Sequence, residues 1–218
     1  MQMIPVRIFF EKMGRAKYTS HLDTMRTMTR AFKRSGLPLW YTQGFNPHLY
    51  CTFALPIALG CESLCETVDL RLTEEVPFEE VVFRLNNSLP PGLRATGAAP
   101  PELDAVEIAL ANYAVTLRCD AQHWSGKLDE LLDRPVIEVT KRTKKGDRLI
   151  DIRPHVELLE REILPGELRL KLRCAAGNAL NINPTLFLQK LGELAGAEPE
   201  GTRILRTSIT TKDGGDFL

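Results

Sequence analysis

The segment 43–48, with the sequence QGFNPH, carries the residue types best suited to ligand binding. Two side-chain amides and one imidazole offer hydrogen-bond donors, acceptors and a group that titrates near neutral pH. Gly44 allows a backbone turn that other residues resist, and Pro47 restricts the residue before it to an extended geometry. A rigid turn in which His48 binds a backbone carbonyl is the simpler interpretation. As a binding site for a polar substrate or partner, the segment would use Gln43, Asn46 and His48.

A second polar group begins a helix predicted over residues 20–35. Ser20 followed by Asp23 is a capping-box pattern with Asp in place of the usual Glu or Gln. Arginines recur at every fourth position from residue 26 to residue 34, so they form one basic ridge along the helix. If His21 lay close to His48, the two imidazoles would make an acid–base pair. The simpler interpretation is that His21 only begins the helix. The predicted surface combines the loop side chains with Ser20, His21, Asp23, Arg26 and Arg30.

Cysteine spacing and the known catalytic motifs favour no complete active site in this chain. A radical SAM cluster uses C-x₃-C-x₂-C, and Cys61 and Cys65 supply only the first spacing, since Val68 occupies the third position. A zinc site that adds Cys51 or His48 is an alternative to buried, apolar cysteines. Gly-rich phosphate loops, His-x-x-x-His pairs and Gly-x-Ser-x-Gly elbows are absent from the sequence. We therefore expect no catalytic residue and no metal ligand.

The elements that would position these residues follow an α+β order. Apolar residues alternate with polar ones over 6–10, 67–72 and 93–98, which predicts strands, and 39–42 is a shorter one. Helical spacing covers 20–35 and the segment that Pro77 opens. The order is βαββαβ, the ferredoxin-like plan. About 23 residues from 43 to 65 then form one long loop, in which 53–55 could add a strand.

The same order recurs more loosely after an acidic, proline-containing connection. Strands are predicted at 113–117, 168–172 and 204–209, helices at 124–132 and from Asn183 to Gly196, and a hairpin over 136–153. Segment 154–166 fits no simple repeat. We predict two tandem ferredoxin-like units, the second elaborated. Their bounds are 1–98 and 111–210, with a linker at 99–110 and a disordered tail at 211–218.

Composition is that of a folded cytoplasmic protein. The 218 residues carry no net charge, no apolar run long enough to span a membrane and no export signal, and the five cysteines favour a reducing compartment. Charge is unevenly distributed, since residues 1–50 hold eight basic and two acidic side chains whereas residues 51–110 hold three and ten. The basic segment favours an anionic partner, and two ordinary solvated faces are the alternative.

Several motifs together resemble one family. They are Tyr18-x-Ser20-His21-Leu22-Asp23 with Arg26, the QGFNPH segment, Phe53-Ala54-Leu55-Pro56, Gly60-x-Glu62-Ser63, Thr143-Lys144-Lys145-Gly146 and Asp151-Ile152-Arg153-Pro154. They resemble the radical-SAM-linked family (DUF2344), in which Pro would be expected where Leu49 stands. The resemblance implies a partner, a radical SAM protein of the cobalamin-binding type encoded beside the chain or fused to it. The iron–sulfur cluster, SAM and cobalamin would belong to that partner, with no cofactor bound by this chain.

Two functional hypotheses follow. The first is an accessory module that binds substrate or partner for the radical SAM enzyme. The alternative is an RNA-binding protein of tRNA or rRNA processing, whose arginine ridge and basic hairpin would contact phosphates. Stacking aromatics of the RNP type are absent, and a charged hairpin tip is commonly plain solvated surface. The predicted RNA-contacting residues of the hairpin are Lys141, Arg142, Lys144, Lys145 and Arg148.

Overall fold

The computed structural model describes residues 3–143, 146–178 and 180–217, and the side chains of 141–143 lie outside this description. The fold is α+β, and the chain divides into two compact units. Residues 1–107 with 216–218 form unit 1, and residues 108–215 form unit 2. The predicted linker 99–110 is therefore divided between the units, because one strand runs to Ala99 and the next begins at Ile108.

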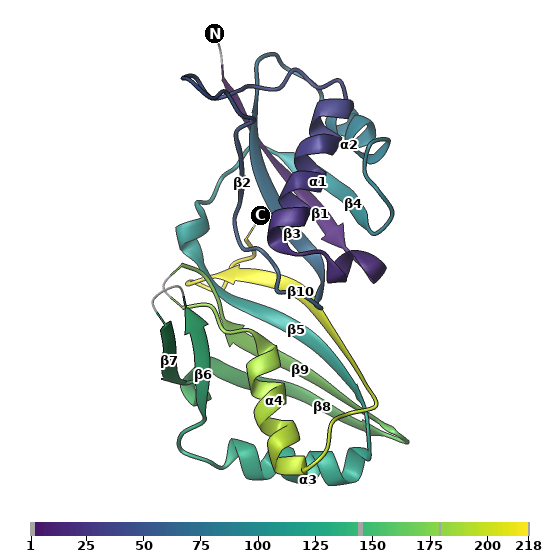
Figure 1. Cartoon of the computed structure of the whole chain (residues 1–218), viewed down its shortest axis with the longest axis vertical. Helices are drawn as coiled ribbons and strands as arrows, with labels where there is room; N and C mark the ends of the chain where they lie inside the picture. The colour runs from purple at the N-terminus through teal and green to yellow at the C-terminus, as the bar shows by residue number, and fades with distance from the viewer. Residues whose placement is uncertain (1–2, 144–145, 179, 218) are drawn as a thin grey trace. The chain divides into compact units, whose positions relative to one another are not determined.

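Unit 1 contains four strands and two α-helices among its described residues (Figure 1). Strand β1 pairs antiparallel with both β3 and β4, and β2 pairs antiparallel with β3, so the order is β4-β1-β3-β2. Two short 3₁₀ helices, η1 (Gly14–Tyr18) and η2 (Ala105–Glu107), lie in the connections. The elements are β1 (Ile4–Lys12), α1 (His21–Arg34), β2 (Cys51–Phe53), β3 (Glu62–Leu72), α2 (Phe78–Asn86) and β4 (Leu93–Ala99).

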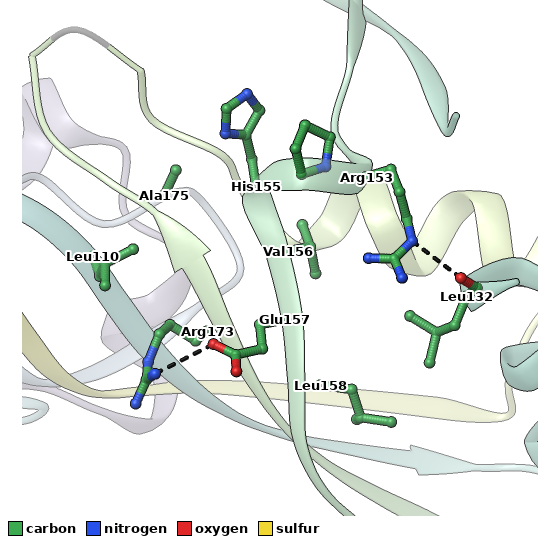
Figure 2. Close-up of a pocket in the computed structure, with 10 residues that line it drawn as sticks. Leu110, Leu132, Arg153, His155, Val156, Glu157, Leu158, Arg173 and Ala175 are labelled. Carbon is green, nitrogen blue, oxygen red and sulfur yellow. Dashed lines mark hydrogen bonds and ion pairs between the residues drawn. The ribbon is translucent and has the colours of Figure 1, made fainter. Parts of the chain in front are cut away.

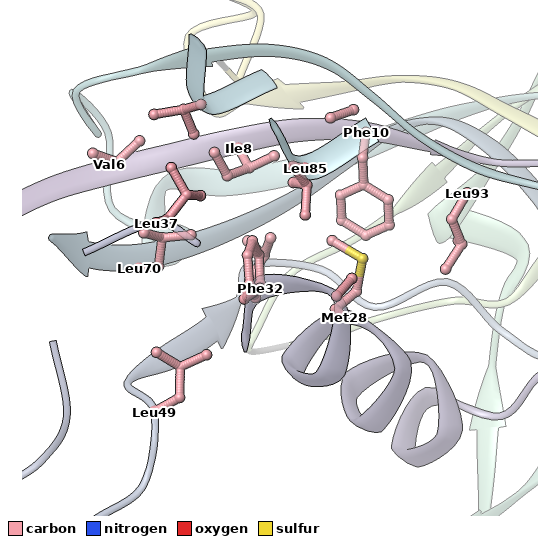
Figure 3. Close-up of a cluster of buried hydrophobic side chains, with 14 of the residues drawn as sticks. Val6, Ile8, Phe10, Met28, Phe32, Leu37, Leu49, Leu70, Leu85 and Leu93 are labelled. Atoms are coloured by element: carbon pink, nitrogen blue, oxygen red, sulfur yellow. The ribbon is translucent and has the colours of Figure 1, made fainter. Parts of the chain in front are cut away.

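The core of unit 1 lies between one face of this sheet and the two helices. Figure 3 shows Phe10 of β1 beside Met28 of α1, with Phe32 one helical turn further along. All three side chains are fully buried, as are Val81 and Leu85 of α2. Burial of one such side chain is worth roughly 1.5–3 kcal/mol, so this face orients α1 on the sheet and leaves its opposite face to solvent.

The structure corrects the prediction of a strand at 39–42. These residues form only two isolated bridges, Leu39 with Leu72 and Tyr41 with Leu49. The Thr42 N–H donates to the His48 carbonyl at 2.8 Å, so the chain folds back on itself before it can extend along the sheet. The second strand of unit 1 is β2, which pairs with residues 68–70 of β3.

Unit 2 has a sheet whose pairing follows the same scheme. Its strands are all antiparallel in the order β10-β5-β9-β8, with α3 after β5 and α4 after β9. Asn183 caps α4 by accepting the Thr185 N–H, and Gly196 ends the helix in the left-handed conformation. The elements are β5 (Ile108–Arg118), α3 (Ala121–Leu132), β6 (Glu138–Thr143), β7 (Gly146–Asp151), η3 (Arg153–His155), β8 (Val156–Leu164), β9 (Glu167–Ala175), α4 (Pro184–Ala195) and β10 (Gly201–Thr211).

Segment 154–166, which fitted no repeat, contains a strand of the main sheet. Strand β8 pairs with β9, whereas β6 and β7 form a separate two-stranded hairpin between α3 and η3. Most side chains of β8 are exposed, and Glu160, Arg161 and Glu162 interrupt its apolar residues. An exposed strand carries little of the alternation that marks a half-buried one, which explains why its sequence was not recognised.

The segment after Thr211, predicted to be a disordered tail, is described through Phe217. The Thr211 N–H donates to the Gly215 carbonyl at 2.9 Å, which closes a turn. Phe217 is buried, and the Arg7 guanidinium lies 4.6 Å from the centre of its ring. Elsewhere in the described residues, none of the helices combines the length and apolar character needed to cross a membrane.

Candidate functional site

The start of α1 is a capped helix terminus. The Asp23 N–H donates to Ser20 Oγ at 3.1 Å, and the Ser20 hydroxyl donates to Asp23 Oδ2 at 2.7 Å. The cap satisfies one of the free N–H groups of the first turn, and Asp23 places negative charge at the positive end of the helix dipole. The predicted N-cap is confirmed, whereas the Asp23 carboxylate accepts the Ser20 hydroxyl and not the Ser20 N–H of a complete capping box. Ser20 and Asp23 therefore have a structural role whatever else they bind.

The loop after β2 packs against this helix start. The rings of His21 and Phe53 meet edge to face with their centroids 5.4 Å apart. The Gly60 N–H donates to the Lys17 carbonyl at 2.8 Å, and Lys12 Nζ donates to the Thr19 carbonyl at 2.8 Å. The motifs around residues 18–23 and 53–62 are therefore parts of one packed region.

Segment 43–48 is the exposed tip of a short hairpin (hereafter the 41–49 hairpin). His48 donates its backbone N–H to Thr42 Oγ1 at 3.1 Å, and its Nδ1 lies 2.9 Å from that oxygen and 3.2 Å from the Asn46 carbonyl. Because the Asn46 carbonyl can only accept, this geometry fits a proton on Nδ1 and leaves Nε2 as an acceptor. The imidazole thus stiffens the turn, as the simpler interpretation of this loop expected.

The structure does not bring Gln43, Asn46 and His48 to the start of α1. Lys12 of β1, whose ammonium group binds the Thr19 carbonyl just before α1, pairs through its backbone with Ser63 of β3. Leu39, at the base of the hairpin, forms a backbone bridge with Leu72 at the other end of β3. The two positions on β3 are separated by about 30 Å at 3.3 Å per residue. The expected single site is therefore two regions at opposite ends of α1, and His21 and His48 form no acid–base pair.

The basic ridge connects these two regions along the exposed face of α1. Arg26 and Asp23 form a long ion pair of 3.5 Å, with both side chains more than half exposed. Arg34 Nη2 donates to the Ser88 carbonyl at 2.7 Å, and Lys33 Nζ lies 6.0 Å from the centre of the Tyr41 ring. Arg30 is exposed, and among the described residues no carboxylate lies within ion-pair distance of it. Two arginines and one lysine of α1 are thus available to an anion.

The structure describes only part of the basic tip of the β6–β7 hairpin. Lys144 and Lys145 lie outside the described residues, as do the side chains of Lys141 and Arg142. Arg148 of β7 is exposed, and its backbone pairs with that of Lys141. The predicted phosphate-contacting role of this hairpin stays a prediction.

Unit 2 has a cavity of about 630 Å³ that the sequence did not indicate (Figure 2). Arg153 donates from Nε to the Leu132 carbonyl at 3.0 Å, and Arg173 Nη1 lies 3.2 Å from Glu157 Oε2. In Figure 2 the Arg153–Leu132 pair and the Arg173–Glu157 pair lie on opposite sides of β8. The cavity therefore lacks a set of charged groups that face one point. Its lining consists of Leu110, Leu132, Arg153, Pro154, His155, Val156, Glu157, Leu158, Arg173 and Ala175.

The carboxylate of Asp151, in the motif beside this cavity, accepts two backbone hydrogen bonds. Its Oδ1 accepts the backbone N–H groups of Ile137 and Arg153, both at 2.9 Å. These two hydrogen bonds lower the pKa of the carboxyl group, because they stabilise its ionised form. Asp151 thereby closes the base of the β6–β7 hairpin and sets the direction in which the chain enters β8.

The described part of the chain shows no metal site at the cysteines, and two of the thiols have a raised pKa. There, no group of three or more His, Cys, Asp or Glu side chains is placed to hold a metal ion. Burial raises the pKa of the Cys51 thiol, with a smaller opposing effect of Thr29, and raises that of Cys174 to about 12. Both thiols are therefore protonated at neutral pH, and a thiolate is the form that binds metals or attacks substrates.

Comparison with known proteins shows the family and the general fold. The model of a family described as "Uncharacterized protein conserved in bacteria (DUF2344)" matches residues 6–184, and the chain belongs to this family. No curated protein matches the chain. A chain in the "Crystal Structure of a Cbf5-Nop10-Gar1 Complex" is similar with a TM-score of 0.52 and 12% identity. The match covers 95% of this chain and 50% of that one, so this chain spans about half the length of its structural neighbour.

Proposed function

We propose that this protein is an accessory module that binds a substrate or partner for a radical SAM enzyme of the cobalamin-binding type. The chain belongs to DUF2344, and the pairing with a radical SAM enzyme is what the resemblance of the motifs quoted above implies. The cluster, SAM and cobalamin would all be on the partner. The observation that carries the binding role is the exposed face of α1. There Arg30 has no carboxylate partner among the described residues, and Arg26 has only a long, exposed one.

The working surface of this module is the exposed face of α1 together with the 41–49 hairpin. Arg26, Arg30 and Lys33 supply positive charge, and the hairpin supplies exposed amide groups at the end of the same helix. An anionic group on the substrate or partner would lie along the helix, since exposed and weakly paired cations favour such a ligand.

Co-purification tests this function in the cytoplasm, where we expect the protein to act. The native radical SAM protein encoded beside the chain would be isolated through a tag on the full chain. Arg26→Glu plus Arg30→Glu should weaken the complex, and Arg94→Glu, an exposed charge reversal on β4, should leave it intact. A complex that tolerates the double reversal refutes this surface, and absence of any radical SAM protein refutes the function.

RNA binding is the second candidate, and the combination of cations with exposed aromatic rings favours it. Tyr18 is exposed beside the start of the ridge, and Phe45 is fully exposed at its other end. Cations contact phosphates without reading sequence, whereas rings can stack on unpaired bases. The bound RNA would then be presented to the partner enzyme for modification.

Salt dependence of binding tests the RNA hypothesis. Affinity for labelled total tRNA would be measured by fluorescence anisotropy over a salt range of about 50–300 mM. Affinity that depends on phosphate contacts falls steeply with salt over such a range. Removal of two contacts by Arg26→Ala plus Arg30→Ala should lower the magnitude of the slope of log K against log salt by about 1.4 to 1.8, at about 0.7 to 0.9 per contact. Arg94→Ala plus Arg134→Ala removes equal charge elsewhere and should not change it. Charge interactions are screened least at the low end of this range, about 50 mM salt. Wild-type protein that binds no RNA there contradicts the hypothesis.

We further propose that both units are ferredoxin-like folds in tandem. The support is the common strand order: β4-β1-β3-β2 in unit 1 corresponds to β10-β5-β9-β8 in unit 2, each with antiparallel neighbours. In this view the β6–β7 hairpin is the elaboration of the second unit, inserted between its first helix and its second strand. An experimental structure with a parallel neighbour within either set would contradict it.

A further inference from the structure

The tip of the 41–49 hairpin exposes an aromatic ring completely. The relative exposure of Phe45 is 105%, the largest among the exposed apolar side chains of the described residues. Gly44 before it has φ of +132°, a conformation that L side chains rarely adopt, so the turn before the ring requires glycine. Single exposed apolar side chains are common on protein surfaces, so the ring points to a ligand only together with the groups around it.

The hairpin that carries Phe45 is anchored on the sheet. Trp40 and Tyr50 flank its base, with their rings 6.1 Å apart and edge to face. The Arg71 guanidinium of β3 lies 4.3 Å from the centre of the Tyr50 ring and 5.3 Å from that of Trp40. With the Thr42–His48 hydrogen bonds, these contacts fix the base of the hairpin, which lowers the entropy that a ligand must remove on binding the tip.

The surroundings of the ring are polar. All residues from 43 to 48 are exposed, and the amide residues Gln43 and Asn46 lie within two positions of Phe45 in the sequence. A protein partner that buried Phe45 would call for a contiguous apolar patch around it. A nucleobase needs only one face of a ring, with amide groups to hydrogen-bond its edge. The composition of the tip therefore matches an unpaired base better than it matches a protein surface.

Cations lead from the hairpin along α1. Lys33 lies over the ring of Tyr41, at the base of the hairpin, and Arg30 lies one turn earlier on the same helix. A strand whose base stacks on Phe45 could thus place its neighbouring phosphates beside these two side chains. Single-stranded nucleic acids are bound by this combination of stacking rings and a positive track.

We propose that the 41–49 hairpin is a base-binding site for single-stranded RNA, in which Phe45 stacks on one unpaired base and Gln43 and Asn46 bind its edge. The inference rests on the second of the two proposed functions and names its substrate class. It also separates two roles on the same surface: α1 supplies affinity through phosphates, and the hairpin selects unpaired over paired bases.

The test uses the full chain and a single-stranded RNA oligonucleotide that carries one 2-aminopurine, compared with the same strand in a duplex. Stacking on Phe45 should change the 2-aminopurine fluorescence. Phe45→Ala should weaken binding of the single strand about tenfold and leave duplex binding unchanged. Phe45→Trp should retain the affinity, whereas Phe45→Leu should behave like alanine, because leucine keeps apolar bulk without a ring face. Because Phe45 is fully exposed, these substitutions should leave the fold intact, and an unchanged melting temperature verifies this.

The salt slope distinguishes failure of this inference from failure of the function beneath it. Phe45→Ala should leave the slope of log K against log salt unchanged, because it removes no charge. If wild-type protein binds RNA and Phe45→Ala or Phe45→Leu binds as tightly, the base-binding site is refuted and RNA binding stands. If wild-type protein binds neither single strand nor duplex, the RNA function is refuted, and this inference with it.

Discussion

Two glycines of unit 2 allow backbone conformation to be separated from steric room. Gly177, which follows β9, has φ of +111°, and a Cβ added there would lie 2.3 Å from the carbonyl oxygen of Ile108. Gly196, which ends α4, has φ of +67°, and an added Cβ would meet nothing within 4 Å. Alanine at either site must adopt a positive φ, but only at Gly177 must the backbone also move.

The magnitudes follow from these contacts. Gly196→Ala should cost about 1 kcal/mol, the usual penalty of a left-handed conformation for an L residue. Gly177→Ala adds overpacking against a carbonyl and should cost at least about 3 kcal/mol in all. With a urea m-value of about 2 kcal/mol/M, the unfolding midpoint should fall by about 0.5 M in the first variant and about 1.5 M in the second.

Urea unfolding followed by tryptophan fluorescence measures both shifts. The chain has two tryptophans, Trp40 in unit 1 and the buried Trp124 in unit 2, so a Trp40→Phe background makes the signal report on unit 2 alone. Equal midpoints for Gly177→Ala and Gly196→Ala would refute the close approach of Gly177 to Ile108. If Gly177→Ala unfolds at the wild-type midpoint, the positive φ of Gly177 in the segment after β9 is refuted as well.

Three further outcomes are expected. Ser20→Ala should destabilise unit 1 by about 1 kcal/mol in chemical denaturation, while Ser20→Asn retains a cap and should cost less. Asp151 has a pKa lowered from 3.8, so its stabilisation is complete above that pH and is lost as the pH falls through the folded-state pKa. The difference in melting temperature between wild type and Asp151→Asn should therefore shrink on acidification below about pH 4, and a constant difference would contradict the role of the carboxylate. Cys174, with a pKa of about 12, should resist iodoacetamide at pH 8 in native protein and react after unfolding, as mass spectrometry would show; alkylation of the native form would contradict its burial.

Local patterns predicted the elements whose signals lie within a few residues. The Ser20–Asp23 cap and the apolar stripe of 20–35 located α1 to within one residue of each end, and Asn183 and Gly196 marked α4 equally well. Strands with one buried face, such as β9, were recognised because alternation along the chain reflects that burial directly.

Elements defined by distant partners were displaced or missed, since the sequence suggests a strand at 53–55 where β2 spans Cys51–Phe53, and it does not indicate β8. Strand β2 has three residues and exists through its pairing with residues 68–70, and β8 is an exposed strand defined by its pairing with β9. Neither pairing leaves a local trace, because backbone hydrogen bonds between strands depend little on side-chain type.

The candidate surface also has some features that follow from local sequence and others that only the tertiary structure determines. Residue types and spacing determined the arginine ridge of α1 and the stiff, polar QGFNPH turn, since both depend on neighbours close in sequence. Only the tertiary structure decided that the turn lies at the end of α1 remote from Ser20 and Asp23. That placement is a matter of register, because Leu39 pairs with Leu72 and not with the other end of β3, where Lys12 meets Ser63.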